Sequence, residues 1–168
     1  SYPPGKPQES LDFAYFGGIY RDAYLISTGP VYITDPNEAG TVAGGGIFFR
    51  TESLDPRTRK GKVGVKVQVA NNTDKEQKVR VQALMTDPKG VDPVGETAPL
   101  VIPPHSTGEV DIPLVISNVR PWSPDNPNLY TLSVEVWKAA GGADAKNPAH
   151  LLDNRSMRVG VRTVEITE

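Results

Sequence analysis

The side chains of this sequence that could take part in catalysis are carboxylates. Two carboxylates flanking a bond can act as acid, base or nucleophile in glycoside hydrolysis. The candidates are Asp12, Asp22, Glu52 and Glu109. The surrounding pattern places each of them in a loop or on the polar face of a strand, where a solvated charge is the simplest interpretation. We therefore expect no catalytic pair within this chain.

The sequence supports a metal or cofactor site even less than it supports a catalytic carboxylate pair. The two histidines are His105, which follows two prolines, and His150, beside a stretch rich in glycine and alanine. Neither has a Cys or His at the spacing of a zinc site. The sequence also lacks a phosphate-binding glycine loop and a Gly-x-Ser-x-Gly nucleophile elbow. We predict that the chain binds no metal and no cofactor.

Composition excludes several classes of partner. A net charge of −2 gives no electrostatic reason to expect nucleic acid or an anionic membrane surface. No apolar run approaches the ~20 residues that cross a bilayer. The sequence contains no cysteine, so it has no disulfides and its redox compartment cannot be inferred. It begins at Ser1 without a signal peptide, which indicates processing or excision from something longer.

Short runs rich in valine and isoleucine, separated by turn residues, are typical of an all-β protein. The 16 glycines and 16 prolines fall largely between these runs. From residue 31 onward, the seven to nine runs at regular spacing predict an immunoglobulin-like β-sandwich. Strands are predicted at residues 23–27, 31–34, 47–51, 62–70, 78–86, 100–102, 110–114, 129–137, 151–152 and 157–166.

Alternation along these strands also predicts how some of them pair. Residues 62–70 and 78–86 each alternate valine with polar residues and are joined by a polar turn. They are expected to form an antiparallel, hairpin-like pair with one solvated face. Pro113 cannot donate to a ladder, so residues 110–114 are expected at a sheet edge or a bulge.

The stretch from residue 118 to residue 137 organises the predicted sandwich. Pro121, Pro124 and Pro127 make its first half a stiff turn that cannot be helical. Tyr130 then opens a strand and stands two residues before Leu132, where an antibody domain would carry a cysteine. This placement matches a tyrosine corner, in which the hydroxyl bonds to backbone upstream and fixes the turn to the strand.

Aromatic residues gather close to the N-terminus. Tyr15, Phe16 and Tyr20 surround a pair of glycines and are followed by Arg21. Packing against a neighbouring sheet is the simpler interpretation of this cluster. The wall of a sugar site is the alternative, because aromatic faces and arginine suit ligands that carry hydroxyl groups.

Two segments together resemble glycoside hydrolase family 2, and in particular its β-galactosidase-like members. Residues 12–25, with Gly-Gly-Ile-Tyr-Arg-Asp at 17–22, look like the last strands of the family's N-terminal sugar-binding jelly roll. Pro-Trp-Ser-Pro at 121–124, Pro-Asn-Leu-Tyr at 127–130 and residues 158–166 look like the end of its immunoglobulin-like domain. Ala23 stands where a valine is usual, and Val159 and Val161 replace common aromatic residues, which blurs the choice of glycoside.

The resemblance implies a division at residue 30. Residues 1–30 would be the C-terminal remnant of the jelly-roll domain, and residues 31–168 the immunoglobulin-like β-sandwich domain. The catalytic glutamates of the family lie on a TIM barrel that follows this domain, so the fragment alone would be inactive. Asp12 would approach the galactose subsite in the parent enzyme. Surfaces that pack against the other domains would include Phe16, Tyr20, Arg21, Trp122 and Arg162.

The main hypothesis is therefore a non-catalytic spacer between the sugar-binding domain and the catalytic barrel of a retaining hydrolase. The alternative is a free-standing carbohydrate-binding or adhesion module that uses Tyr15, Phe16, Tyr20 and Trp122. Residues 13–27, removed from their native sheet, would expose apolar strand surface and could pair with a second copy as a swapped dimer. By family habit the parent enzyme is expected in the periplasm or outside the cell.

Overall fold

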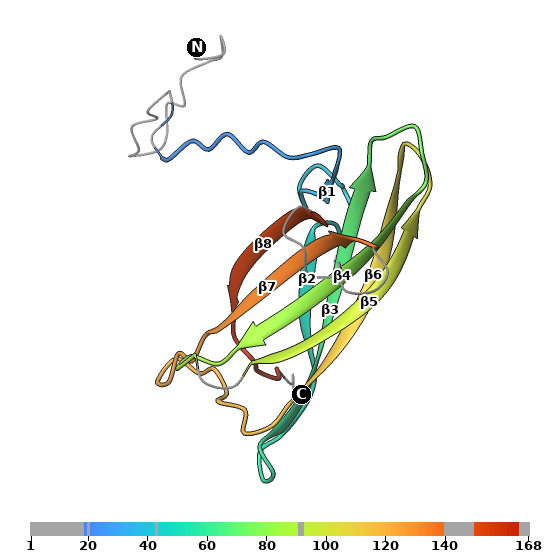
Figure 1. Ribbon diagram of the computed structural model, residues 1–168. Helices are drawn as coiled ribbons and strands as arrows, with labels where there is room; N and C mark the ends of the chain where they lie inside the picture. Colours follow the sequence, from blue (N-terminus) through green and yellow to red (C-terminus); the bar gives the residue numbers. More distant parts are fainter. Residues whose placement is uncertain (1–18, 20, 43, 91–92, 140–149, 165–168) are drawn as a thin grey trace, which may run out of the picture.

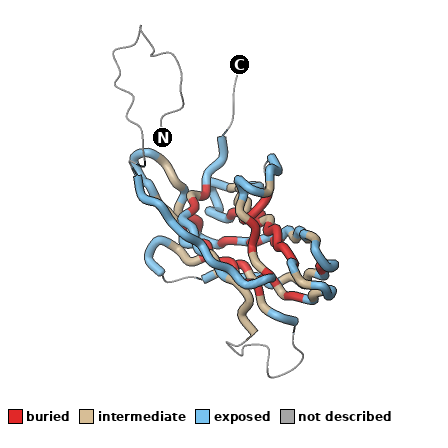
Figure 2. Tube along the Cα trace, turned by 90° about the horizontal axis from the view of Figure 1, so that it is seen from above, coloured by how far each residue is buried: buried red, intermediate tan, exposed pale blue. Residues whose placement is uncertain are grey.

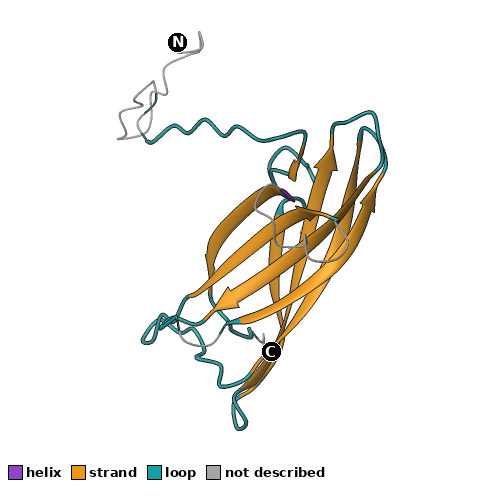
Figure 3. Ribbon diagram, viewed as in Figure 1, coloured by secondary structure: helices purple, strands orange, loops and turns teal. Residues whose placement is uncertain are grey.

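A computed structural model describes residues 19, 21–42, 44–90, 93–139 and 150–164, which form eight strands in two facing antiparallel sheets (Figures 1 and 3). The first sheet contains β1 (Val31–Ile33), β2 (Ile47–Asp55), β3 (Lys60–Asn71) and β6 (Ser106–Ile116). The second contains β4 (Gln77–Thr86), β5 (Val94–Ile102), β7 (Tyr130–Lys138) and β8 (Leu151–Val159). The predicted all-β sandwich and its strand count are confirmed.

The longest strand, β3, is central to the first sheet. β6 pairs along the whole of one side of β3, while β1 and β2 share the other side, with β1 at the Asn71 end. Successive side chains of a strand point to opposite faces. One face of β3 is therefore continuous apolar surface, and its valines are completely buried: Val63, Val65, Val67 and Val69.

The second sheet has the strand order β5-β4-β7-β8 and supplies the other half of the core. Its inward residues come from β4 and from β7, the strand that Tyr130 opens. Figure 2 shows the buried residues lying between the two sheets. Each buried Val, Leu or Met side chain contributes about 1.5–3 kcal/mol relative to exposure. These inward residues are Val79, Val81, Ala83, Met85, Leu132, Val134 and Val136.

The predicted pairing of residues 62–70 with residues 78–86 is wrong. These segments are β3 and β4, and they lie in opposite sheets. Each carries a complete apolar face, and two such faces cover one another when the strands lie in facing layers rather than side by side. The connection between them crosses the sandwich beside Asn71, whose side-chain amide donates to the backbone carbonyls of Lys75 at 2.8 Å and Pro103 at 2.9 Å.

Two further strand predictions need correction. Residues 23–27 form no strand: they are extended and exposed, and they run away from the sandwich (Figure 1). No described strand pairs with them. The two strands predicted at 151–152 and 157–166 are one strand, β8, which ends at Val159. Pro113 does lie in an edge strand, because β6 pairs only with β3 among the described strands.

One edge of the sandwich is closed by side chains rather than by strand pairing. The backbone N–H of Ile33 in β1 donates to the carboxylate of Asp153 in β8 at 2.8 Å. The guanidinium of Arg155, also in β8, donates to the carbonyl of Ile33 at 3.4 Å. The two sheets are thereby joined where their edges meet. Within the described ranges, no helix has the length and apolar character needed to span a membrane.

Candidate functional site

The carboxylates singled out from the sequence do not form a catalytic pair among the described residues. Glu52 is in ion pairs with Lys62 and Arg50, each at 2.9 Å. The hydrogen bond from Lys62 is the main reason that the pKa of Glu52 lies below its ordinary value. Glu109 accepts a hydrogen bond from the Gln68 amide at 3.0 Å. Asp22 is exposed and accepts one from the Tyr24 hydroxyl.

Glu52 belongs to a network on the outer face of the first sheet. Arg50 of β2 reaches across β3 to Asp111 of β6, at 2.5 Å, and also bonds to Glu52. Its guanidinium occupies the space above Gly64, where a Cβ atom would lie 2.5 Å from the Arg50 Cζ atom. The hydrogen bond to Asp111 raises the pKa of Arg50. These charges are paired with one another, which is a structural arrangement rather than a reactive one.

The two histidines also have structural surroundings. The Nε2 atom of His105 lies 2.8 Å from a carboxylate oxygen of Asp74, and this contact joins the β5–β6 turn to the β3–β4 turn. His150 immediately precedes β8. The described residues contain no group of three His, Cys, Asp or Glu side chains that could hold a metal ion.

Trp122 and Arg162, two of the predicted packing residues, lie together near the end of the sandwich at which β8 ends. The Cζ atom of Arg162 lies 4.5 Å from the centroid of the Trp122 ring, within the range of a cation–π contact. The ring also lies against Gly160, where a Cβ atom would come within 2.9 Å of the Trp122 Cβ atom. With Leu129 these residues line a hollow of about 210 Å³. We call Trp122, Leu129, Gly160 and Arg162 the junction surface.

Backbone hydrogen bonds hold the junction surface in place. The N–H of Trp122 donates to the carbonyl of Val161 at 2.9 Å. The N–H of Arg162 donates to the Thr51 hydroxyl at 3.3 Å, which connects the residues after β8 to the first sheet. Both sheets therefore position this surface.

The tyrosine corner has the predicted hydrogen bond. Tyr130 is 2% exposed, and its hydroxyl accepts the backbone N–H of Arg120 at 2.9 Å. The turn before β7 is also tied to the β2–β3 hairpin, because the N–H of Val119 donates to the carbonyl of Arg59 at 2.8 Å. The turn that carries Trp122 is thus fixed to both sheets.

Of the remaining substrate-binding and packing candidates, only Arg21 lies in the described part of the chain. Asp12, Phe16 and Tyr20 lie outside the described residues. Arg21 is exposed on the extended segment that precedes β1 (Figure 1).

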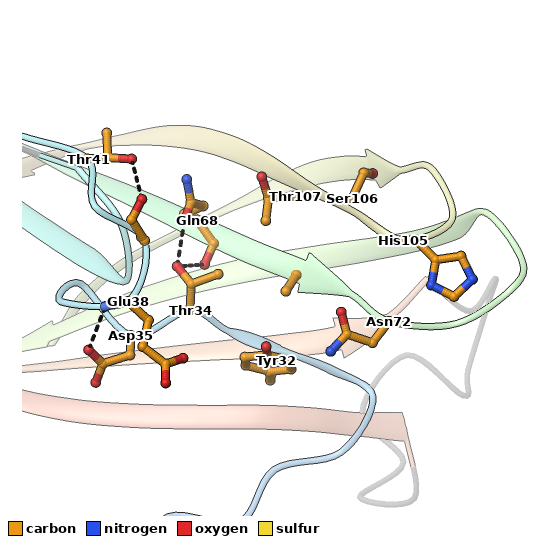
Figure 4. A pocket seen from close by; sticks show the side chains of 12 residues that line it. Tyr32, Thr34, Asp35, Glu38, Thr41, Gln68, Asn72, His105, Ser106 and Thr107 are labelled. Atoms are coloured by element: carbon orange, nitrogen blue, oxygen red, sulfur yellow. Dashed lines mark hydrogen bonds between the residues drawn. The ribbon is translucent and has the colours of Figure 1, made fainter.

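Sequence reasoning missed a polar hollow beside β1, shown in Figure 4. Tyr32, Asp35 and Glu38 contribute to it, together with residues of β3 and β6. The sequence signal was the Asp35-Pro36 pair, which by itself predicts only the end of a strand.

Comparison with known proteins identifies the family of the sandwich. The family model for glycosyl hydrolases family 2 matches residues 45–162. A β-galactosidase of Priestia megaterium is 27% identical over 159 residues, covering 94% of this chain and 13% of the relative. A putative β-glucuronidase of Formosa agariphila is 24% identical over 169 residues, covering 100% of this chain and 17% of the relative.

The fold of this chain is similar to part of a solved structure. The crystal structure of a Bacteroides uniformis β-glucuronidase superposes with a TM-score of 0.72 at 18% identity, covering 93% of this chain and 17% of that one. The chain thus spans less than a fifth of the length of these relatives. Because the family model covers most of the sequence, including seven of the eight described strands, the chain belongs to glycosyl hydrolase family 2.

Proposed function

We propose that this chain is a non-catalytic part of a β-galactosidase-like retaining glycosidase, in which the sandwich is a rigid spacer between a sugar-binding domain and a catalytic barrel. The parent enzyme would hydrolyse O-glycosidic bonds of carbohydrates. The relatives named above are called β-galactosidase and β-glucuronidase, and they are several times longer than this chain. A structural role for one part of such an enzyme is consistent with both facts.

The positions at which the chain joins and leaves the sandwich carry the proposal. Val31, the first residue of β1, pairs with Asn71 at one end of β3. Arg162, after β8, bonds to Thr51, which pairs with Val63 near the other end of β3. The eight residue-to-residue steps from Val63 to Asn71 correspond to about 26 Å at about 3.3 Å per step. A sandwich of this length would hold the preceding and succeeding domains of the parent enzyme apart.

Rigidity is the second requirement of a spacer. The core is buried between two sheets, one edge is bridged by Asp153 and Arg155, and the turn before β7 is fixed by Tyr130. None of these contacts needs a ligand. The junction surface lies at the end of the sandwich where the chain leaves β8. We propose that it packs against the barrel through Trp122 and Arg162.

The pKa shifts of Glu52 and Asp55 fit a non-catalytic role for these two carboxylates. A glycosidase acid needs a carboxyl group with a raised pKa. Glu52 and Asp55 have pKa values shifted in the opposite direction, below the ordinary range. Hydrogen bonds from the Thr58 hydroxyl and backbone are the main cause at Asp55.

Residues 1–30 are proposed to belong to the preceding jelly roll. The relatives match almost the whole chain, whereas the family model begins at residue 45. Leu25 is 97% exposed and Tyr24 is 81% exposed, although both are residues that usually pack against something. In the parent, this segment would complete the jelly-roll sheet. In the isolated chain, residues 13–27 could instead pair with a second copy.

The test compares two proteins on p-nitrophenyl β-galactoside and p-nitrophenyl β-glucuronide. One is this chain, and the other is the full-length parent protein with its catalytic barrel. We expect turnover of one of these substrates by the longer protein alone. Turnover by the 168-residue chain would contradict the spacer role, and an inactive longer protein would contradict the glycosidase assignment.

A further inference from the structure

Two adjoining hollows lie beside β1, away from the junction surface, and they share Tyr32, Asp35 and Glu38. The first has a volume of about 380 Å³ and reaches Gln68 on β3 and Thr107 on β6. The second has a volume of about 290 Å³ and extends to Tyr24 and Arg155. Small-molecule sites have volumes of roughly 300–1,000 Å³, so each hollow is near the lower end of that range.

The wall of the hollows is held in one conformation by hydrogen bonds. The Asp35 carboxylate accepts the backbone N–H of Asn37 at 2.8 Å and that of Glu38 at 3.4 Å, which closes a tight turn. The Thr34 hydroxyl donates to the side-chain oxygen of Gln68 at 2.7 Å and accepts the N–H of Gly46 at 2.8 Å. A site built on such fixed groups loses little conformational freedom when it binds a ligand.

The lining is rich in hydroxyl, amide and carboxylate groups around one tyrosine ring. Figure 4 shows Tyr32 beside Thr34 and Asp35, Gln68 hydrogen-bonded to Thr34, and Thr107 and Ser106 farther along the same hollow. The hydroxyl and amide groups among them are neutral hydrogen-bond donors and acceptors, which suit a ligand that carries many hydroxyl groups. The tyrosine ring offers an apolar face of the kind that packs against a pyranose ring.

We infer that these two hollows form a binding site for a neutral oligosaccharide, with one sugar residue in each hollow and Tyr32 between them. Carboxylates accept hydrogen bonds from the ligand hydroxyls, and Arg155 donates to them. Charge disfavours uronic acids relative to neutral sugars. Asp35 and Glu38 line both hollows, whereas Arg155 lines only the second, so two negative charges outweigh one positive charge near a sugar carboxylate. This inference goes beyond the spacer role, and neither one depends on the other.

The experiment uses the isotopically labelled 168-residue chain and follows its backbone amide resonances during titration. The probes are galactotriose and the matched trimer of galacturonic acid, which has the same ring skeleton with a carboxylate on each sugar. Variants Tyr32→Ala and Glu38→Gln alter the site. Asp125→Asn, on the exposed turn before β7, is the matched carboxylate control. Tyr32→Phe shows whether a change at residue 32 preserves the fold.

With galactotriose we expect saturable shifts at residues 32–38 and 105–107, with a Kd on the order of 1 mM. Glu38→Gln should weaken binding by roughly threefold or more, since the hydrogen bond from the ligand would go to a neutral amide oxygen instead of a charged carboxylate. Tyr32→Ala should abolish binding, and Asp125→Asn should change nothing. Three results would each overturn the site: no saturable shift, shifts confined to the junction surface, or equal binding of the galacturonic acid trimer. None of them would bear on the spacer role.

Discussion

The guanidinium of Arg162 lies over the indole ring of Trp122, with 4.5 Å between the Cζ atom and the ring centroid. The two residues come from segments forty positions apart, one in the turn before β7 and the other after β8. Their contact fixes the chain as it leaves the sandwich. It also covers a face of the tryptophan ring that a free-standing sugar-binding module would need for stacking. The contact therefore favours packing between domains over sugar binding at Trp122.

Replacing Arg162 tests this contact. Arg162→Ala should lower the free energy of unfolding by about 0.5–1 kcal/mol, the magnitude of a partly solvated cation–π pair. A double-mutant cycle with Trp122→Leu, measured by urea denaturation, isolates the pairwise energy. Arg158→Ala, at an exposed position on β8, is the matched control and should be neutral. A coupling energy indistinguishable from zero would show that the pair does not stabilise this end of the sandwich.

The hydrogen bond of the tyrosine corner predicts how much stability is lost when the hydroxyl oxygen of Tyr130 is removed. Tyr130→Phe deletes the acceptor of the Arg120 N–H and should cost about 1 kcal/mol of stability. Thermal and urea unfolding measure the loss. Tyr32→Phe removes an equivalent hydroxyl from an open polar hollow and should leave stability unchanged. If the two variants were equally stable, the Tyr130 hydroxyl would not be fixing the turn.

Asn71 should be one of the most sensitive polar residues of the chain. It is completely buried, and its side-chain amide lies within hydrogen-bond distance of the carbonyls of Lys75, Ile102 and Pro103. Asn71→Ala should destabilise the protein by about 1–3 kcal/mol, because buried carbonyls lose their donor. The neighbouring exposed Asn72, changed to Ala, is the control. Equal unfolding midpoints for the two variants would contradict the proposed role of the amide.

Titration of Glu52 should account for part of the pH dependence of stability. Its folded-state pKa lies below the ordinary value of 4.5, so its ion pairs stabilise the protein above that pH. This contribution is lost as the pH falls from about 4.5 through the folded-state pKa. Unfolding midpoints of Glu52→Gln between neutral pH and pH 3 should therefore fall less steeply than those of the natural sequence. Glu96→Gln should keep the natural slope, and an unchanged slope for Glu52→Gln would show that the pairing contributes nothing.

The elements of the fold could be predicted from particular residues. Val63, Val65, Val67 and Val69 predict β3 because their alternation leaves one apolar face. Tyr130, after three prolines, predicts both the turn and its hydrogen bond. Trp122 and Arg162 entered the set of packing residues through the family resemblance, and the structure places them in contact.

The predictions that failed depend on information that alternation does not contain. β3 and β4 carry the same pattern whether they pair or face each other, so the pattern could not assign them to sheets. The hollow around Tyr32 depends on the return of the chain from β1 to β2. That return needs positive φ at Gly45 and Gly46, with φ of 75° and 57°, and places a Gly45 Cβ position 2.6 Å from the Ala39 Cβ atom. Such a close approach can be seen only after the loop is folded.

The spacer role is tested most directly by measuring the distance between the two ends of the sandwich in solution. The chain has no cysteine, so Asn72→Cys and Asp125→Cys, both at exposed positions near opposite ends, can be spin-labelled as a unique pair. Pulsed electron–electron double resonance should give one narrow distance distribution, and the same distribution when the pair is placed in the longer protein proposed as the parent. A broad distribution, or one that changes between the chain and the longer protein, would contradict a rigid spacer.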